Sequence, residues 1–354
     1  MRVLALVPYP TGRAPGQRYR IEQWAGLLRK DAIEVTFAPF LSESGMEVIY
    51  EKGRTLSKAA ATLRGYARRV GHRLRRQAFD VAYVYREVAL LAPAWVERLL
   101  TIGLPLVYDF DDAIYLPDAS AANAWMRHLK TRRKTEELCR RARHVTVGNA
   151  VLAEFARAQG PPVTIVPSTI DTDVYRVEPR SPGAKPLVGW TGSTTTLRHL
   201  LEIAPALRQL RRRIDFELRV IGGEVRLEGL DVRCIPWRAE SETDDLRLID
   251  VGLMPLPDDE WSRGKCGMKA LQYMALGIPP VVSPVGANAT IVADGVNGFH
   301  ARTEAEWVER LATLIEHPAL RARLGAAARR TVEDSYSARV HAPRMGAVLR
   351  EAAR

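Results

Sequence analysis

The chain has 354 residues, of which 47% are hydrophobic and 26% charged, and its formal net charge is +11 at pH 7. This composition excludes a disordered protein, and the length exceeds what one hydrophobic core usually fills, so we expect two domains. No apolar run reaches the roughly 20 residues of a membrane span. Three cysteines, Cys139, Cys234 and Cys266, lack the spacing of a zinc site or a disulfide framework. The basic excess points to a polyanionic partner: nucleotide phosphates, anionic lipid or nucleic acid.

The N-terminal half alternates short apolar runs with helical or basic segments. Its first run, residues 2–7, is too short for a signal peptide and is typical of a first buried strand in a cytoplasmic protein. Further strands are predicted at 34–39, 81–85, 104–108, 144–147 and 163–166. Such alternation favours a parallel sheet with crossover helices.

The same pattern restarts after residues 178–186, EPRSPGAKP, which we interpret as a linker. Strands are predicted at 187–190, 216–221, 232–235, 251–254, 280–283 and 298–300, and a helix capped by Thr194 or Thr195 should run to about residue 212. After Thr303 the chain should be helical, with interruptions at Pro318 and Pro343. We therefore predict an α/β fold of two doubly wound, Rossmann-like domains, with the ligand in a cleft between the carboxyl ends of their sheets.

Residues 262–286, SRGKCGMKALQYMALGIPPVVSPVG, predict a loop, an amphipathic helix and a buried strand. If the helix begins near Lys265, then Lys265, Lys269 and Gln272 project from one face. Two cations at a helix start suit an anion, because the exposed N–H groups and the positive dipole end already favour phosphate. Solvated surface lysines are the alternative interpretation.

Together with two other stretches, this segment resembles the family-4-type retaining glycosyltransferases of GT-B fold. The stretches are VTVGNAVLAEF and IVPSTIDTDVYRV within 144–177, DVGLMPLPDD at 250–259, and KALQYMALGIPPVVSPVGA followed by IVADGVNGFHA within 269–301. The resemblance implies an acceptor domain at 1–180, a nucleotide-sugar domain at 181–335, and a final helix, 336–354, that crosses back to the first domain. It also implies a hexosyl transfer to a hydroxyl acceptor without metal or other cofactor.

The chain departs from the family at the donor site. Where the family usually carries two Glu separated by seven residues, this sequence has Gly264 and Gln272. Gln272 can bind ribose hydroxyls, whereas Gly264 offers only its backbone, so a nearby carboxylate (Asp258, Asp259 or Glu260) is a candidate substitute. The family's diphosphate-binding Arg and Lys are also missing from GWTGSTTT, 189–196. We therefore assign the donor phosphates to Arg263, Lys265 and Lys269, with Gly192 and Ser193 supplying a backbone nest.

Three carboxylates follow a predicted strand of the first domain, in VYDFDDAIYL, 107–116. We assign acceptor binding to Asp109 and Asp111, and catalysis to Asp111 and Asp112 together with Lys265 and Lys269. Two other interpretations stay open. The cluster could hold a hard cation, or an aspartate could cap the next helix or pair with Arg86.

Two more segments are expected to rim the cleft. In GRAPGQRYR, 12–20, Gly16 could approach the diphosphate, and Arg18 and Arg20 could meet an anionic acceptor. Trp237 follows a strand and could flank the base. Solvated arginines and a core tryptophan are the alternatives. No histidine has the spacing of a metal site or a catalytic triad.

The segment from Lys52 to Arg76 is amphipathic, with a stripe of Leu, Ala, Tyr and Val opposite seven basic residues. It predicts peripheral association with anionic membranes on the cytoplasmic side, and hence a lipid-linked or membrane-proximal acceptor. We favour packing of the stripe on the domain, with the basic side toward lipid; the alternative is that the stripe itself enters the interface. Other functions for the whole chain are a GT-B-type nucleotide-sugar epimerase or a non-catalytic binder, and no nucleic-acid motif is present.

Overall fold

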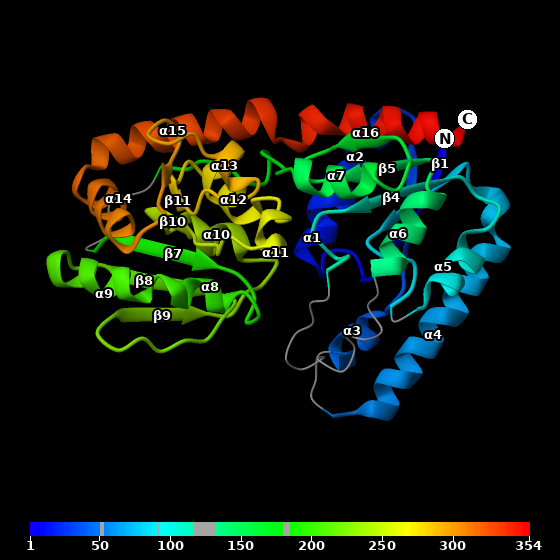
Figure 1. Ribbon diagram of the computed structural model, residues 1–354, viewed down its shortest axis with the longest axis horizontal. Coiled ribbons are helices and arrows are strands. Elements are labelled where there is room, and N and C mark those ends of the chain that lie inside the picture. The colour runs from blue at the N-terminus through cyan, green and yellow to red at the C-terminus, as the bar shows by residue number, and fades with distance from the viewer. Residues whose placement is uncertain (50–52, 91, 117–131, 180–184) are drawn as a thin grey trace. The chain divides into compact units, whose positions relative to one another are not determined.

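A computed structural model describes residues 1–49, 53–90, 92–116, 132–179 and 185–354 (Figure 1). These residues form two compact units. Met1–Ser168 and His341–Arg354 make the first, and Thr169–Val340 makes the second. The predicted domain boundary at 180/181 and most of the predicted linker lie outside the described residues.

The first unit is built on a parallel six-stranded sheet in the order β2-β1-β3-β4-β5-β6. Its strands are β1 (Arg2–Val7), β2 (Glu34–Pro39), β3 (Val81–Tyr85), β4 (Leu106–Phe110), β5 (His144–Val147) and β6 (Val163–Ile165). Every position of β3, β4 and β5 is buried, as expected for a parallel sheet covered on both faces. All six strands were predicted from the sequence, β4 with a shift of two residues.

Helices and short helical turns connect these strands. They are α1 (Pro15–Gln17), a π-helical turn (Arg18–Glu22), α2 (Gln23–Lys30), α3 (Glu43–Ile49), α4 (Thr55–Leu74), a 3-10 turn (Arg76–Ala78), α5 (Ala94–Thr101), α6 (Arg132–Arg141) and α7 (Ala150–Arg157). In α7, Asn149 caps the helix by accepting from the N–H of Leu152.

The second unit repeats the plan with the order β12-β11-β10-β7-β8-β9. Its strands are β7 (Leu187–Thr191), β8 (Glu217–Ile221), β9 (Asp231–Ile235), β10 (Val251–Met254), β11 (Pro280–Val282) and β12 (Phe299–His300). The core between this sheet and its helices is aliphatic and aromatic, with Trp190, Phe216 and Trp307 as its largest members. The structure confirms the six predicted strands.

Helix boundaries in the C-terminal half of the chain differ from the prediction at three places, two of them in the second unit. The helices of that unit are α8 (Leu197–Glu202), α9 (Ala204–Arg213), α10 (Glu242–Arg247), α11 (Glu260–Arg263), α12 (Met268–Ala275), α13 (Asn288–Ile291), α14 (Glu304–Glu316) and α15 (Pro318–Ser335). The helix expected to reach residue 212 is divided at Ile203, and no side chain caps α8. Helix α12 begins at Met268, because Gly267 (φ 70°) turns the chain just before it. The third difference concerns Pro343.

Helix α16 (Ala338–Ala353) contains Pro343, where an interruption was predicted. The chain is interrupted earlier, at Tyr336 and Ser337, and continues through the proline. From His341 onward its residues belong to the first unit. Among the described residues, no helix is long and apolar enough to cross a membrane.

Candidate functional site

The strand order of the second unit creates a switch point between β7 and β10. From β7 the chain proceeds outward to β8 and β9, and then returns to place β10 on the other side of β7. In open parallel sheets, ligands bind beyond the carboxyl ends of the strands at such a point. The loops that flank it here are 192–196, after β7, and 255–259, after β10.

The loop after β7 lies against the loop after β8. Gly222 has φ 86°, and a Cβ there would come within 2.3 Å of the carbonyl oxygen of Gly192. Only glycine permits that approach. Ser193 is exposed beside this contact, and its carbonyl accepts from the N–H groups of Thr196 (2.9 Å) and Leu197 (3.1 Å). The predicted Gly192–Ser193 turn is therefore placed at the switch point, before α8.

Two lysines gather near the same loop. Lys269 places Nζ 5.6 Å above the ring of Trp190 on β7, and Lys265 places Nζ 5.7 Å from the ring of Trp261. Both charges, with Arg198, act on His199 of α8. Burial of His199, followed by Lys265, Arg198 and Lys269, lowers the pKa of the imidazole from 6.5 to about 4.

The lysines do not share a helix face as predicted. Lys265 precedes α12, which begins at Met268, so the two are brought together by the loop rather than by helical spacing. Tyr273 fixes α12 against β7: its hydroxyl accepts from the N–H of Thr191 (3.0 Å) and donates to the carbonyl of Gly189 (3.3 Å).

Arg263 lies at the outer margin of this cluster. Its guanidinium forms an exposed ion pair with Asp258, at 2.7 Å. Gly286, after β11, packs on the backbone of Arg263, since a Cβ there would lie 2.6 Å from the arginine's carbonyl oxygen. Arg263 is therefore the point where the loops after β10 and β11 meet the segment before α12. Its contact with a donor phosphate stays a prediction.

The structure corrects the role predicted for Gln272, which is only 5% exposed. Its amide nitrogen donates to the Glu242 carboxylate and to the Tyr175 hydroxyl, each at 3.1 Å. Trp237, assigned to the base, donates to the same carboxylate at 2.8 Å, as does Tyr175. Glu242, itself buried, thus holds three donors from separate segments, and sequence reasoning missed it because an acidic helix start is usually a surface feature.

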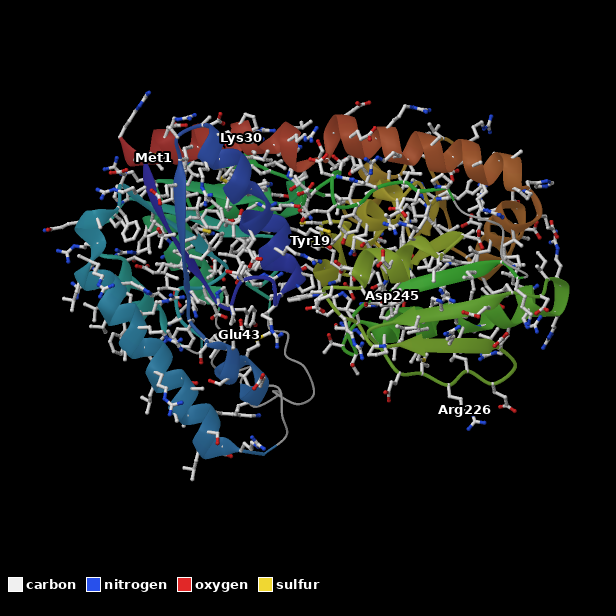
Figure 2. The ribbon with its side chains drawn as sticks, turned by 180° about the vertical axis from the view of Figure 1, so that it is seen from behind. Met1, Tyr19, Lys30, Glu43, Arg226 and Asp245 are labelled. Carbon is white, nitrogen blue, oxygen red and sulfur yellow. The ribbon has the colours of Figure 1, made fainter. Side chains whose placement is uncertain are left out.

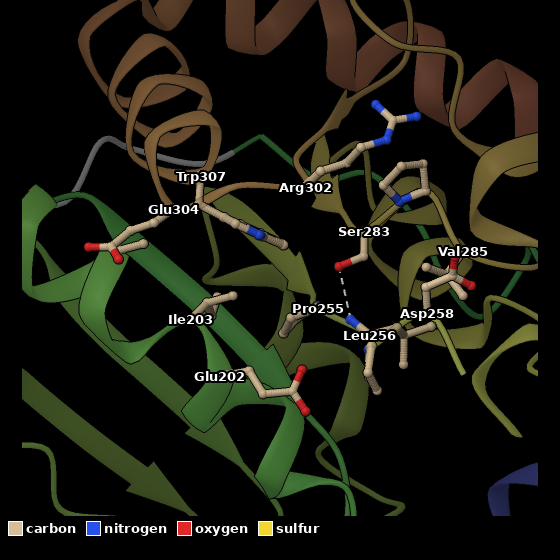
Figure 3. Close-up of a pocket in the computed structure, with 13 residues that line it drawn as sticks. Glu202, Ile203, Pro255, Leu256, Asp258, Ser283, Val285, Arg302, Glu304 and Trp307 are labelled. Atoms are coloured by element: carbon tan, nitrogen blue, oxygen red, sulfur yellow. Dashed lines mark hydrogen bonds between the residues drawn. The ribbon is translucent and has the colours of Figure 1, made fainter. Parts of the chain in front are cut away.

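The second unit also contains a pocket of about 400 Å³, which neither lysine lines (Figure 3). It opens between the loops after β10 and β11, the end of α8 and the start of α14. The hydroxyl of Ser283 accepts from the N–H of Leu256 (3.0 Å) and ties the first two loops together. Its charged lining is Glu202, Asp258, Arg302 and Glu304. With three carboxylates and one arginine, the lining of this pocket repels a diphosphate. The surroundings of Lys265 and Lys269 are better suited to that anion.

In the first unit the switch point lies between β1 and β3, and Asp111 and Asp112 follow the next strand, β4. Asp111 accepts from the Tyr85 hydroxyl (2.9 Å) and from Arg86 Nε (2.8 Å), and Asp112 accepts from the same guanidinium (2.6 Å). Arg86 adopts φ 62°, a conformation rare for side chains larger than glycine and common at functional sites. The pairing with Arg86, one of the interpretations left open, is the arrangement present.

This pairing bears on the catalytic role predicted for Asp111, which could include taking the acceptor's proton. Burial alone would raise the pKa of Asp111, but the charges of Arg86 and Arg20 and the hydrogen bonds from Arg86 and Tyr85 hold it below its ordinary value. With its pKa held below the ordinary value, Asp111 is a weaker general base than an unpaired aspartate, and its catalytic role stays a prediction. Asp111 and Asp112 are better suited to holding hydroxyl groups.

Gly16 belongs to α1 and packs on this cluster. A Cβ at Gly16 would lie 2.4 Å from the Tyr85 hydroxyl and 3.2 Å from an Asp111 oxygen. The glycine is therefore required by packing, which is a different reason from the predicted diphosphate contact. Arg18 is half-buried, and it donates to the Tyr19 hydroxyl at 2.8 Å.

Arg20 and Asp109 were predicted to bind an acceptor, and the structure contradicts this. Both side chains are 0% exposed and paired with each other, with Arg20 Nε 3.0 Å from an Asp109 oxygen. Arg20 also donates to the carbonyl of Val166, and Asp109 accepts from the hydroxyl of Thr146. Burial keeps both side chains away from any ligand. Their role is structural: the pair joins the π-helical turn to β4, β5 and the segment after β6.

No group of three or more His, Cys, Asp or Glu side chains is arranged to hold a metal ion in the part of the chain that the structure describes. Cys139, Cys234 and Cys266 form no disulfide.

The chain has two parallel six-stranded sheets, and the strand order of each contains a switch point of the kind where ligands bind. This is the two-domain α/β architecture of the GT-B fold, as predicted. Residues 185–317 match the family model described as glycosyl transferases group 1. No curated protein sequence matches the chain significantly.

Solved structures of similar fold include three whose alignments extend over nearly the whole chain. Sucrose-phosphate synthase from Thermosynechococcus elongatus aligns with a TM-score of 0.73 at 14% identity, over 99% of both chains. HepE from Anabaena, in complex with UDP and glucose, gives 0.70 at 15% identity, also over 99% of both. A glycosyltransferase from Rickettsia africae gives 0.69 at 12% identity, over 99% of this chain and 98% of that one. At such identities the structures establish the fold.

Proposed function

We propose that the protein is a retaining glycosyltransferase that moves a sugar from a nucleoside-diphosphate sugar to a hydroxyl acceptor. The observation that carries the proposal is the convergence of Lys265, Lys269 and the Gly192–Ser193 turn at the switch point of the unit that matches glycosyl transferases group 1. HepE, which shares the fold, is described in complex with UDP-glucose, so UDP is a sensible first probe.

Catalysis would rest on positioning and electrostatics. Negative charge develops on the diphosphate as the glycosidic bond breaks, and fixed cations in a partly dehydrated site stabilise that charge. Lys265 and Lys269 supply these cations, and the backbone N–H groups near Ser193 add donors. His199 stays neutral at physiological pH, since its pKa is lowered to about 4, and so adds no charge.

The proposal extends to metal independence and to the acceptor. With the leaving group held by lysines, the reaction needs no divalent ion or other cofactor. Asp111 and Asp112, both paired with Arg86, hold acceptor hydroxyls rather than removing their protons. We include an acceptor that is lipid-linked or lies near a membrane, for which the surface of the first unit supplies an independent argument below.

The test is a transfer assay. Purified protein is incubated with UDP-sugars and hydroxyl acceptors, and release of UDP is measured together with the anomeric configuration of the product. Acceptor-dependent release, unchanged by EDTA and giving the donor's configuration, is the expected result. Conversion of one nucleotide sugar into another without an acceptor would instead show an epimerase. If chelation abolishes turnover and a divalent ion restores it, the metal-free mechanism is wrong.

A further inference from the structure

Exposed large hydrophobic side chains gather on two neighbouring helices of the first unit. Across the described residues there are thirteen such side chains, and seven of them lie on α4, on α5 or directly after α5. The seven are Leu56, Leu63, Val70, Leu74, Trp95, Leu99 and Ile102. Single exposed hydrophobics are normal, but a contiguous group marks an interaction surface.

Helix α4 packs on its own unit through its smallest residues. Its buried residues are Ala61, Gly65 and Arg69, and a Cβ at Gly65 would lie 2.6 Å from the ring of Phe40. Arg69 donates to the carbonyls of Val7, Ala38 and Val88, beyond or near the ends of three strands. Arg69 is thus inside the unit, not on the basic face assigned to it from the sequence.

This packing turns the apolar stripe outward. At about 100° per residue, Leu56, Leu63, Val70 and Leu74 fall opposite Ala61, Gly65 and Arg69. Leu56 is 87% exposed, Leu63 69% and Leu74 76%. The geometry favoured from the sequence, with the stripe against the domain, is therefore wrong: the leucines face outward, as the alternative of a stripe that enters the interface requires, and the insertion itself stays a prediction. The physical reason is that the helix approaches the ring of Phe40 so closely at Gly65 that no side chain fits there, so the leucines lie on the opposite side of the helix.

Helix α5 lies alongside α4 and continues the surface (Figure 1). Trp95, Leu99 and Ile102 are spaced by four and three residues, so they share one side, and Trp95 is 67% exposed. Figure 2 shows α4 along an edge of the first unit with side chains directed away from it. An exposed tryptophan beside a stripe of exposed leucines is typical of protein surfaces that lie in a lipid interface.

The exposed charged side chains on α4 and α5 themselves are basic. Helix α4 contains four arginines and one lysine and no Asp or Glu. On α5, Arg98 is exposed, whereas the helix's one carboxylate, Glu97, is buried and paired with Lys134 at 2.8 Å. A patch that combines exposed leucines with the exposed arginines Arg64 and Arg98 complements an anionic bilayer better than a neutral one.

We propose that α4 and α5 form a membrane-docking surface, on which Leu56, Leu63, Val70, Leu74, Trp95 and Leu99 insert into the headgroup boundary of an anionic bilayer while Arg64 and Arg98 contact lipid phosphates. The surface anchors the protein peripherally, through insertion rather than by a basic face alone. The inference rests on this patch and not on glycosyl transfer, so it can fail while the proposed function stands.

Vesicle co-sedimentation of the full chain tests the surface. Vesicles of phosphatidylcholine, with and without about one-third phosphatidylglycerol, are compared for the native chain and for Leu63→Gln/Leu74→Gln. We expect binding to the anionic vesicles alone, and at least a tenfold weaker partition for the variant, since full burial of one leucine is worth about tenfold or more. Arg64→Gln/Arg98→Gln should weaken binding and reduce its salt dependence.

A matched variant, Leu248→Gln/Val296→Gln, replaces two exposed hydrophobics of the second unit and should bind vesicles like the native chain. Thermal unfolding checks that all variants are folded. Equal binding to neutral vesicles, or no binding to anionic ones, overturns the proposal. So does a concentration-dependent dimer, seen by light scattering, that Leu63→Gln/Leu74→Gln abolishes, because the stripe would then be covered by a second copy.

Discussion

At the carboxyl end of β4, three carboxylates within four residues have different surroundings. Asp109 is sealed beneath Arg20, whereas Asp111 keeps an edge toward solvent and shares Arg86 with Asp112. The sequence shows three aspartates in similar positions, and the difference between them comes from which arginine reaches each one. Burial of a charge requires a partner, and here the partner lies 89 residues away for Asp109.

Lys265→Ala and Lys269→Ala should each weaken UDP binding by about tenfold to a hundredfold, the usual cost of one charge-assisted hydrogen bond. Isothermal titration calorimetry provides the measurement. Lys30→Ala, an exposed lysine on α2 in the other unit, is the control and should leave affinity unchanged. If both variants bind UDP as tightly as the native chain, the lysines are solvated surface residues and do not contact the diphosphate.

His199 should make stability depend on pH. The pKa of its imidazole is 6.5 in the unfolded chain and is lowered to about 4 in the folded one. Between these two pH values the unfolded chain binds a proton at His199 and the folded chain does not. Stability is therefore complete above 6.5 and is lost as pH falls toward 4. Burial of the imidazole and the charges of Lys265, Arg198 and Lys269 favour this loss, and Asp259 opposes it. Urea unfolding of His199→Gln should show a shallower pH dependence; an unchanged slope would contradict the assignment.

Gly16→Ala should destabilise the first unit by about 1–3 kcal/mol, because the added methyl overlaps the Tyr85 hydroxyl. Gly26→Ala is a matched control within α2: it is exposed, nothing lies within 4 Å of its added Cβ, and it should stabilise by about 0.5–1 kcal/mol. Urea midpoints measure both. The packing argument fails if the two substitutions shift the midpoint in the same direction.

At the scale of elements, close contact decides which side of a helix is buried. Helix α4 buries glycine, alanine and an arginine while exposing leucines, the reverse of what an amphipathic pattern predicts for a helix on a domain. In the second unit, the Glu242 carboxylate joins α10 to α12, to the loop after β9 and to Tyr175. Both arrangements depend on partners that are remote in sequence.

Glu242→Ala should therefore destabilise the second unit by about 2–4 kcal/mol, since each buried donor left without an acceptor costs about 1–3 kcal/mol. Asp244→Ala is the control on the same helix. Its partner is Arg247, in an exposed pair, so its loss should cost less than about 1 kcal/mol. Chemical denaturation followed by tryptophan fluorescence measures both, and equal effects would mean that the network contributes nothing.

At the scale of the whole molecule, two units repeat one plan, and the match to glycosyl transferases group 1 lies within the second. We predict that UDP at about one hundred times its Kd stabilises the protein by about 2.7 kcal/mol and raises the melting temperature by roughly 5–10 °C. Scanning fluorimetry with UDP provides the measurement, with uridine as the control that lacks phosphates. The absence of a shift with UDP and every other common nucleoside diphosphate would remove the transferase proposal.

The sequence by itself determined the twelve strands, the parallel α/β class and the loops that carry the site. These follow from local signals, since apolar runs bounded by Gly and Pro suffice to predict a buried parallel strand. It also placed Lys265, Lys269 and Ser193 among the ligand-binding residues before their positions were known, although their binding role is still a prediction.

Only the tertiary structure decided which charges are buried and which faces are outward. Arg20, Arg69 and Gln272 look like surface residues in the sequence, yet their partners, Asp109, three strand-end carbonyls and Glu242, reach them through folding alone. The outward turn of the α4 stripe likewise depends on the ring of Phe40 lying against Gly65. Burial and pairing are properties of contacts between distant segments, and no local pattern encodes them.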